Sequence, residues 1–167
     1  MITVLAGGSG SGKSLMAEAL AASLPPPVTF VATWIPADDP DMLARVAAHR
    51  ARRPAGWAVR EAGRDLVDVI RSVDGTVLVD ALGTWVAGAE GFEVDVADLC
   101  EAVRSRSGDT VIVTDEVGQG VHPSSEAGRA FRDALGRVNQ AVVAVADQAW
   151  LVVAGRVVPL ARAPWGT

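Results

Sequence analysis

The first fourteen residues constrain the fold more than any other stretch of the chain. A short apolar run, Ile2–Ala6, leads into Gly7-Gly8-Ser9-Gly10-Ser11-Gly12-Lys13-Ser14, which matches the pattern G-x-x-x-x-G-K-S. An apolar run before this motif predicts a buried strand, and the residues after it predict a helix over Lys13–Leu24. The glycines allow successive backbone N–H groups to surround an anion. The stretch therefore predicts a phosphate-binding loop.

The two polar residues that end the loop have roles that follow from their chemistry. Lys13 is expected to reach the β- and γ-phosphates of a nucleotide, and the Ser14 hydroxyl is expected to bind Mg²⁺. A flexible linker is the other interpretation of so many small residues. That interpretation is disfavoured because a linker needs neither a strand before it nor Lys13-Ser14 after it.

The composition is that of an ordinary globular chain without a broad positive surface. The chain has 167 residues, of which 50% are hydrophobic, and its formal net charge is −5. We expect one domain over residues 1–167 and no nucleic acid partner. The single cysteine, Cys100, excludes an internal disulfide and fits a reducing cytoplasm. No targeting segment is visible and no apolar run approaches the roughly 18 residues that span a bilayer, so we expect a soluble cytoplasmic protein with no membrane partner.

Short β-branched runs alternate with helix-patterned stretches along the chain. This rhythm is typical of an α/β fold in which helices cover both faces of a mostly parallel central sheet. Strands are expected at Ile2–Ala6, Val28–Ala32, Thr76–Asp80, Thr110–Thr114 and Trp150–Ala154, with Val157–Leu160 as a closing hairpin strand. Helices are expected at Lys13–Leu24, Pro40–Arg50, Gly63–Ser72, Asp95–Ser105 and Ser125–Ala146.

Ligands of such sheets bind at the carboxyl ends of the strands, where two acidic positions stand out. Asp80 closes one expected strand, and Asp115-Glu116 follows another. Either aspartate could supply the carboxylate that holds Mg²⁺ beside Ser14, and either could instead cap a turn. The sequence does not choose between them. Asp80 has the better claim because it ends its strand as a single acid, whereas Asp115 and Glu116 could orient a substrate hydroxyl or act as a base.

A second unusual stretch runs from Asp38 to Pro54, with acids at its start and arginines at its end. This distribution suits the dipole of a helix, which explains both charge clusters without any function. His49 shares one helical face with Met42 and Val46. From spacing alone, a histidine at the end of a helix is more often a cap or a solvated group than a catalytic residue.

Several strings of residues, spread over nearly the whole chain, resemble one known family. They are the phosphate loop, His49-Arg50-x-Arg52-Arg53-Pro54-x-x-Trp57, Glu116-Val117-Gly118-x-Gly120-Val121-x-Pro123, and Arg129-x-Phe131-Arg132-Asp133-x-Leu135-Gly136-Arg137-Val138-Asn139-Gln140. The chain resembles the bifunctional adenosylcobinamide kinase/adenosylcobinamide-phosphate guanylyltransferase family of cobalamin biosynthesis. The phosphate loop alone would not be specific to this family, but several of the other strings are.

The resemblance implies a RecA-like P-loop NTPase fold, a homo-oligomer that is usually a trimer, and two reactions on a corrinoid. Such enzymes phosphorylate adenosylcobinamide with ATP or GTP. They then transfer GMP from GTP to that phosphate through a guanylylated histidine, giving adenosylcobinamide-GDP. His49 corresponds to this histidine, and Lys13 is the second implied catalytic residue. The implied nucleotide contacts are Gly7, Gly8, Ser9, Gly10, Ser11, Gly12, Lys13, Ser14, Ala32, Thr33, Trp34, Arg50, Ala51, Arg52, Arg53, Glu61 and Asp80.

The chemistry of these residue types agrees with the implied roles. A neutral imidazole, with an unperturbed pKa of about 6.5, is a competent nucleophile toward phosphorus at neutral pH. Arg50, Arg52 and Arg53 are suited to hold triphosphate charge and to stabilise departing pyrophosphate. The chain departs from the residues usual in the family at four positions, which are Gly10, Trp34, Asp115 and His122.

Two other functions remain open at the level of the sequence. A monofunctional P-loop kinase of another small alcohol would explain Lys13 and Asp80 but would leave His49 without a role. A non-catalytic GTP-responsive subunit would use the same loop only to order an assembly.

Overall fold

A seven-stranded sheet runs through the centre of the computed structural model, which describes residues 1–34 and 54–165. The strands are β1 (Ile2–Gly7), β2 (Val28–Ala32), β3 (Ala58–Glu61), β4 (Thr76–Asp80), β5 (Thr110–Asp115), β6 (Gln148–Val153) and β7 (Arg156–Pro159). They lie in the order β3-β2-β4-β5-β1-β6-β7, and each neighbouring pair is parallel except the hairpin of β6 and β7. The predicted mostly parallel sheet with a C-terminal hairpin is confirmed.

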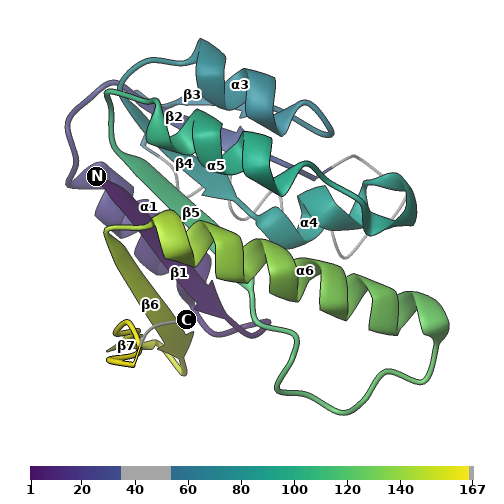
Figure 1. Ribbon diagram of the computed structural model, residues 1–167. Helices are drawn as coiled ribbons and strands as arrows, with labels where there is room; N and C mark the ends of the chain where they lie inside the picture. Colours follow the sequence, from purple (N-terminus) through teal and green to yellow (C-terminus); the bar gives the residue numbers. More distant parts are fainter. Residues whose placement is uncertain (35–53, 166–167) are drawn as a thin grey trace.

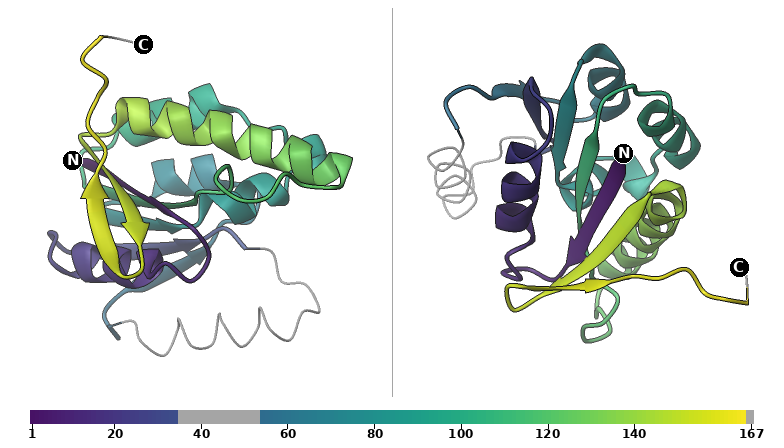
Figure 2. Two further views of the ribbon diagram at one scale, coloured as in Figure 1. Left: turned by 90° about the horizontal axis from the view of Figure 1, so that it is seen from below. Right: turned by 90° about the vertical axis from the view of Figure 1, so that its left-hand side faces the viewer.

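Helices cover both faces of this sheet, as predicted. One face is covered by α1 (Lys13–Ala22), and the opposite face by α3 (Leu66–Ser72), α4 (Leu82–Ala87), α5 (Val96–Arg104) and α6 (Glu126–Val145) (Figures 1 and 2). A single 3₁₀ turn, η1 (Glu90–Phe92), joins α4 to α5. Side-chain caps start the two longer helices of the second face, because Asp95 accepts from the backbone N–H of Asp98 and Ser125 from that of Gly128. None of the described helices is long and apolar enough to cross a membrane.

The central strands are mostly apolar because both of their faces are buried, and their polar residues are mainly buried threonines and the aspartates that end β4 and β5. Successive residues of β1 show this, since Val4 packs with α3 to α6 whereas Leu5 packs with α1. The same alternation separates Val79 from Leu78 on β4. Cys100 lies buried in the larger core, as expected for a small apolar side chain, and this burial raises the pKa of its thiol.

Three short elements are absent from the sequence prediction. The edge strand β3 has all four residues exposed, so it lacks the alternation that marks a half-buried strand. The helix α4 has six residues, and η1 has three, which is too short for a helical period to be visible. The predicted helix Pro40–Arg50 lies outside the described residues.

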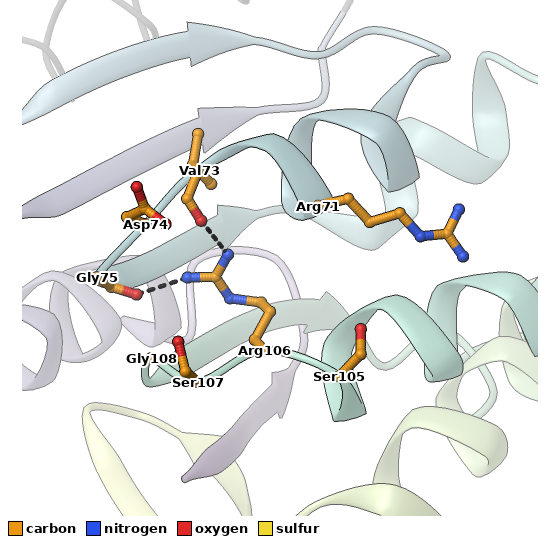
Figure 3. A pocket seen from close by; sticks show the side chains of 8 residues that line it. All are labelled: Arg71, Val73, Asp74, Gly75, Ser105, Arg106, Ser107 and Gly108. Atoms are coloured by element: carbon orange, nitrogen blue, oxygen red, sulfur yellow. Dashed lines mark hydrogen bonds between the residues drawn. The ribbon is translucent and has the colours of Figure 1, made fainter.

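Arg106 connects the segment before β5 to the segment between α3 and β4, at the edge of the sheet where these strands begin. Arg106 follows α5, and its guanidinium donates hydrogen bonds to the backbone carbonyls of Val73 at 2.5 Å and Gly75 at 2.5 Å (Figure 3). It also donates to the carbonyl of Ile70 at 2.7 Å. The carbonyls of Ile70 and Val73 belong to the end of α3, where helical carbonyls lack partners. Burial lowers the pKa of Arg106, and Asp74 opposes this effect. Arg106 therefore satisfies the end of α3 and anchors the start of β4.

Removing this guanidinium should destabilise the fold. Arg106→Met keeps much of the side-chain volume but leaves three carbonyls without their donor, so the free energy of unfolding should fall by about 1–3 kcal/mol. Arg104→Met is the matched control because Arg104 is exposed at the end of α5, and its cost should stay within about 0.5 kcal/mol. Urea unfolding of both variants measures the difference, and equal costs would contradict the anchoring role.

Candidate nucleotide-binding site

The loop after β1 contains a tight turn held by backbone hydrogen bonds. Gly10 and Gly12 have φ angles of 70° and 94°, a region that glycine adopts without strain. The N–H of Ser11 donates to the carbonyl of Gly8 at 3.2 Å. The carbonyl of Ser11 in turn accepts from the N–H of Gly155, in the turn between β6 and β7, at 2.9 Å. This loop is therefore attached to the neighbouring hairpin.

The two polar residues that end the loop contact different carboxylates. The Lys13 ammonium lies 2.8 Å from Asp115 Oδ1 and also donates to the carbonyl of Gly8 at 3.1 Å. The Ser14 hydroxyl donates to Asp80 Oδ1 at 3.2 Å. The sequence left open which aspartate lies beside Ser14, and the structure places Asp80 there and Asp115 beside Lys13.

Strand order and register explain this arrangement. Because β5 lies between β4 and β1, their carboxyl ends are adjacent, with Gly7 opposite Asp115 on β5. On the other side of β4, Ala32 is opposite both Asp80 and Glu61, so these three residues form a row across β4, β2 and β3. Glu61 is exposed at the end of this row.

Thr33 holds the segment that follows Asp80. Its side chain is fully buried, and its Oγ1 accepts from the N–H of Ala81 at 3.1 Å. The same oxygen lies 2.5 Å from the carbonyl oxygen of Ala81 and 2.5 Å from the hydroxyl of Thr84. Resemblance named Thr33 as a nucleotide contact, but its described contacts are with the protein. The next residue, Trp34, is partly exposed at the same edge.

Asn139 on α6 holds the end of β5 in place. Its Nδ2 donates to the carbonyl of Asp115 at 3.0 Å, and its Oδ1 lies 2.5 Å from the buried hydroxyl of Thr114. Glu116 continues from Asp115 and donates its N–H to the carbonyl of Gly7 at 3.0 Å. The sequence analysis assigned no role to Asn139 or Thr84, and no local pattern could have done so, because both act on segments distant along the chain.

The remaining site predictions lie outside the described residues. These are His49, Arg50, Ala51, Arg52 and Arg53, and their roles stay predictions. The other histidine, His122, is exposed, and its Nδ1 is 3.0 Å from a guanidinium nitrogen of Arg132.

Few side chains that could bind a metal ion lie together in the described part of the chain. No group of three or more His, Cys, Asp or Glu side chains gathers there. The hydroxyl of Ser14 and the carboxylate of Asp80 form a pair of oxygen donors. Mg²⁺ is usually bound by one or two protein oxygens together with substrate phosphates and water, so this pair fits such an ion.

These features define an α/β nucleotide-binding protein with a phosphate loop, and comparisons with known proteins specify its family. The sequence model of the family described as cobinamide kinase / cobinamide phosphate guanyltransferase matches residues 3–160. The chain is 37% identical to the bifunctional adenosylcobalamin biosynthesis protein CobU of Salmonella typhimurium, over 93% of this chain and 97% of that protein. It is 34% identical to CobP of Pseudomonas aeruginosa, over 98% and 99% of the two chains. The chain belongs to the cobinamide kinase / cobinamide phosphate guanyltransferase family.

A solved structure supports the fold class independently. The chain superposes on an ATPase of the type III secretion system of pathogenic bacteria with a TM-score of 0.55, at 12% identity, covering 90% of this chain and 50% of that one. At such low identity the likeness concerns the fold alone. Together with the strand order, it confirms the predicted RecA-like P-loop fold.

The buried hydroxyl of Thr33 provides a test of this edge of the sheet. Thr33→Val preserves shape but leaves the N–H of Ala81 without its acceptor, while the Thr84 hydroxyl keeps the carbonyl of Ala81 as its partner. The free energy of unfolding should therefore fall by about 1–3 kcal/mol. Thr33→Ser keeps the hydroxyl and should recover the hydrogen-bond part of this loss. Denaturant unfolding of the two variants measures it, and a serine variant no more stable than the valine variant would argue against the hydrogen-bond network.

Proposed function

We propose that residues 1–167 act as one domain that carries out both reactions of its family. It would phosphorylate adenosylcobinamide with ATP or GTP and then transfer GMP from GTP to the resulting phosphate. The observation that carries the proposal is the placement of Lys13 and Ser14 against two carboxylates, in a chain that matches the family over residues 3–160. The homo-oligomer implied by the resemblance stays a prediction.

The kinase step would use the loop between β1 and α1. Backbone N–H groups of Gly8–Lys13 would bind the phosphates, and the Lys13 ammonium would stabilise charge on the transferred γ-phosphoryl group. Ser14 and Asp80 would hold Mg²⁺, which would supply positive charge beside the phosphates. Positioning of the substrate hydroxyl in line with the phosphoryl group supplies much of the catalysis in such reactions.

The transferase step would use residues of the 35–53 segment. The imidazole of His49 would attack the α-phosphorus of GTP, forming an N–P bond while pyrophosphate leaves. The phosphate oxygen of adenosylcobinamide phosphate would then attack the same phosphorus and release the histidine. Arg50, Arg52 and Arg53 would stabilise the departing pyrophosphate, and Ala32, Thr33, Trp34, Ala51 and Glu61 would complete the nucleotide contacts.

The covalent step predicts a modified protein. After incubation with GTP and Mg²⁺, the intact mass of the wild type should rise by one GMP group, and the adduct should be lost in acid because a phosphoramidate N–P bond is acid-labile. His49→Ala should show no mass increase. The measurement is intact-protein mass spectrometry before and after acid treatment.

The sequence offers a matched control for this experiment. The chain has two histidines, and His122 is exposed on a loop after β5. His122→Ala should accept GMP like the wild type. An adduct that survives in His49→Ala, or that is lost in His122→Ala, would reassign the nucleophile. GTP binding without an adduct in any of the three proteins would instead favour a monofunctional kinase.

The proposed metal ligand can be tested by binding alone. Asp80→Asn removes the charge of the carboxylate beside Ser14, so the Mg²⁺ concentration needed for half-maximal stabilisation of the GTP complex should rise by about tenfold or more. Asp68→Asn removes an equal charge at an exposed position of α3 and should leave this requirement unchanged. Thermal unfolding in GTP over a Mg²⁺ titration measures both. An unchanged requirement in Asp80→Asn would exclude Asp80 as a ligand.

A further inference from the structure

The lysine that ends the phosphate loop is paired with a carboxylate. Lys13 Nζ lies 2.8 Å from Asp115 Oδ1 and 3.1 Å from the carbonyl oxygen of Gly8. The side chain of Lys13 is 10% exposed and that of Asp115 is 30% exposed. An ammonium has three donors, so two of them are directed at protein oxygens on the side of the loop where β5 ends.

The carboxylate of Asp115 is positioned by three separate elements. Its main-chain carbonyl accepts from Asn139 of α6, as described above, and β5 aligns it with Gly7 of β1. On the α4 side, its Oδ2 lies so close to Gly83 that a Cβ at this position would collide with it. Only a residue without a side chain leaves this space to the carboxylate. The ion pair with Lys13 therefore involves a carboxylate packed against α4, on a backbone that α6 and β1 hold in place.

Phosphate and Asp115 need the same ammonium. A nucleotide whose β- and γ-phosphates bind in the loop must take Lys13 from the carboxylate or share it, and its negative charge then lies close to a second negative charge. Both effects oppose nucleotide binding. Replacing the carboxylate by an amide of the same shape removes the charge competition while leaving an oxygen that accepts from Lys13.

We propose that Asp115 weakens nucleotide binding by competing with the β- and γ-phosphates for Lys13, and that it thereby sets the affinity of this site for nucleoside triphosphates. This inference rests on the proposed function, because it assumes that a triphosphate binds in the loop. Asp115 is thus a positioning residue that acts through Lys13. Its effect should be largest for nucleotides that carry β- and γ-phosphates and smaller for a monophosphate.

The test compares binding of GTP and of GMP to the wild type, Asp115→Asn and the charge control Asp68→Asn. Isothermal titration calorimetry is done both with Mg²⁺ and with EDTA. Asp115→Asn should bind GTP about two- to fivefold more tightly in both conditions, the upper part of the range expected for one partly exposed ion pair. GMP affinity should change less, and Asp68→Asn should match the wild type. A merely structural role of Asp115 would not make GTP bind more tightly.

Each other outcome contradicts the inference in a recognisable way. Unchanged GTP affinity in Asp115→Asn would show that the ion pair does not compete with phosphate. Weaker binding in Mg²⁺ but not in EDTA would identify Asp115 as a metal ligand instead. An equal gain for GMP and GTP, or the same gain in Asp68→Asn, would indicate a general charge effect. Failure of GTP to bind to the wild type in either condition would overturn the proposed function as well.

Discussion

Parallel pairing of β4, β5 and β1 determines where each charged group near the loop lies. Because the strands run in the same direction, all of them end at one edge, and the residues that follow them meet there. The loop after β1 supplies a lysine and a serine, β4 supplies Asp80, and β5 supplies Asp115. A change in the order of these strands would separate the loop from both carboxylates, although the motif itself would be intact.

The sequence predicts the parts of this fold that are buried on both faces. β1, β4 and β5 were found because two apolar layers require continuous β-branched runs, and the hairpin was found because Gly155 separates two such runs. β3 was missed since an exposed edge strand has no apolar pattern of its own. α4 was missed because one and a half turns of helix are selected by packing of Leu82, Trp85 and Val86 against the core.

In the site, too, residues with a local sequence pattern were predictable and residues placed by packing were not. Lys13 and Ser14 were identified from a local motif, whose spacing reflects the chemistry of phosphate binding. The assignment of Asp80 and Asp115 to different partners depends on which strand lies next to β1, and two strand-ending acids look alike in a sequence. Gly83 lies on α4, before β5 in the chain, and leaves space for the carboxylate of Asp115. Asn139 lies on α6, after β5, and donates to the main-chain carbonyl of Asp115. Such long-range contacts follow from packing, so they leave no local signal.

The competition for Lys13 bears on an enzyme that carries out two steps with nucleotides. In the proposed function, a nucleoside diphosphate would have to leave after phosphoryl transfer before GTP could bind in the same loop for the next step. A lysine free to bind phosphate alone would hold this product as well as the substrate, and tight product binding slows turnover. In the proposed competition, a carboxylate that recaptures the ammonium would favour product release. The cost is weaker substrate binding, which matters little when the nucleotide concentration is above the dissociation constant. A phosphate loop of moderate affinity therefore suits two successive reactions better than one of maximal affinity.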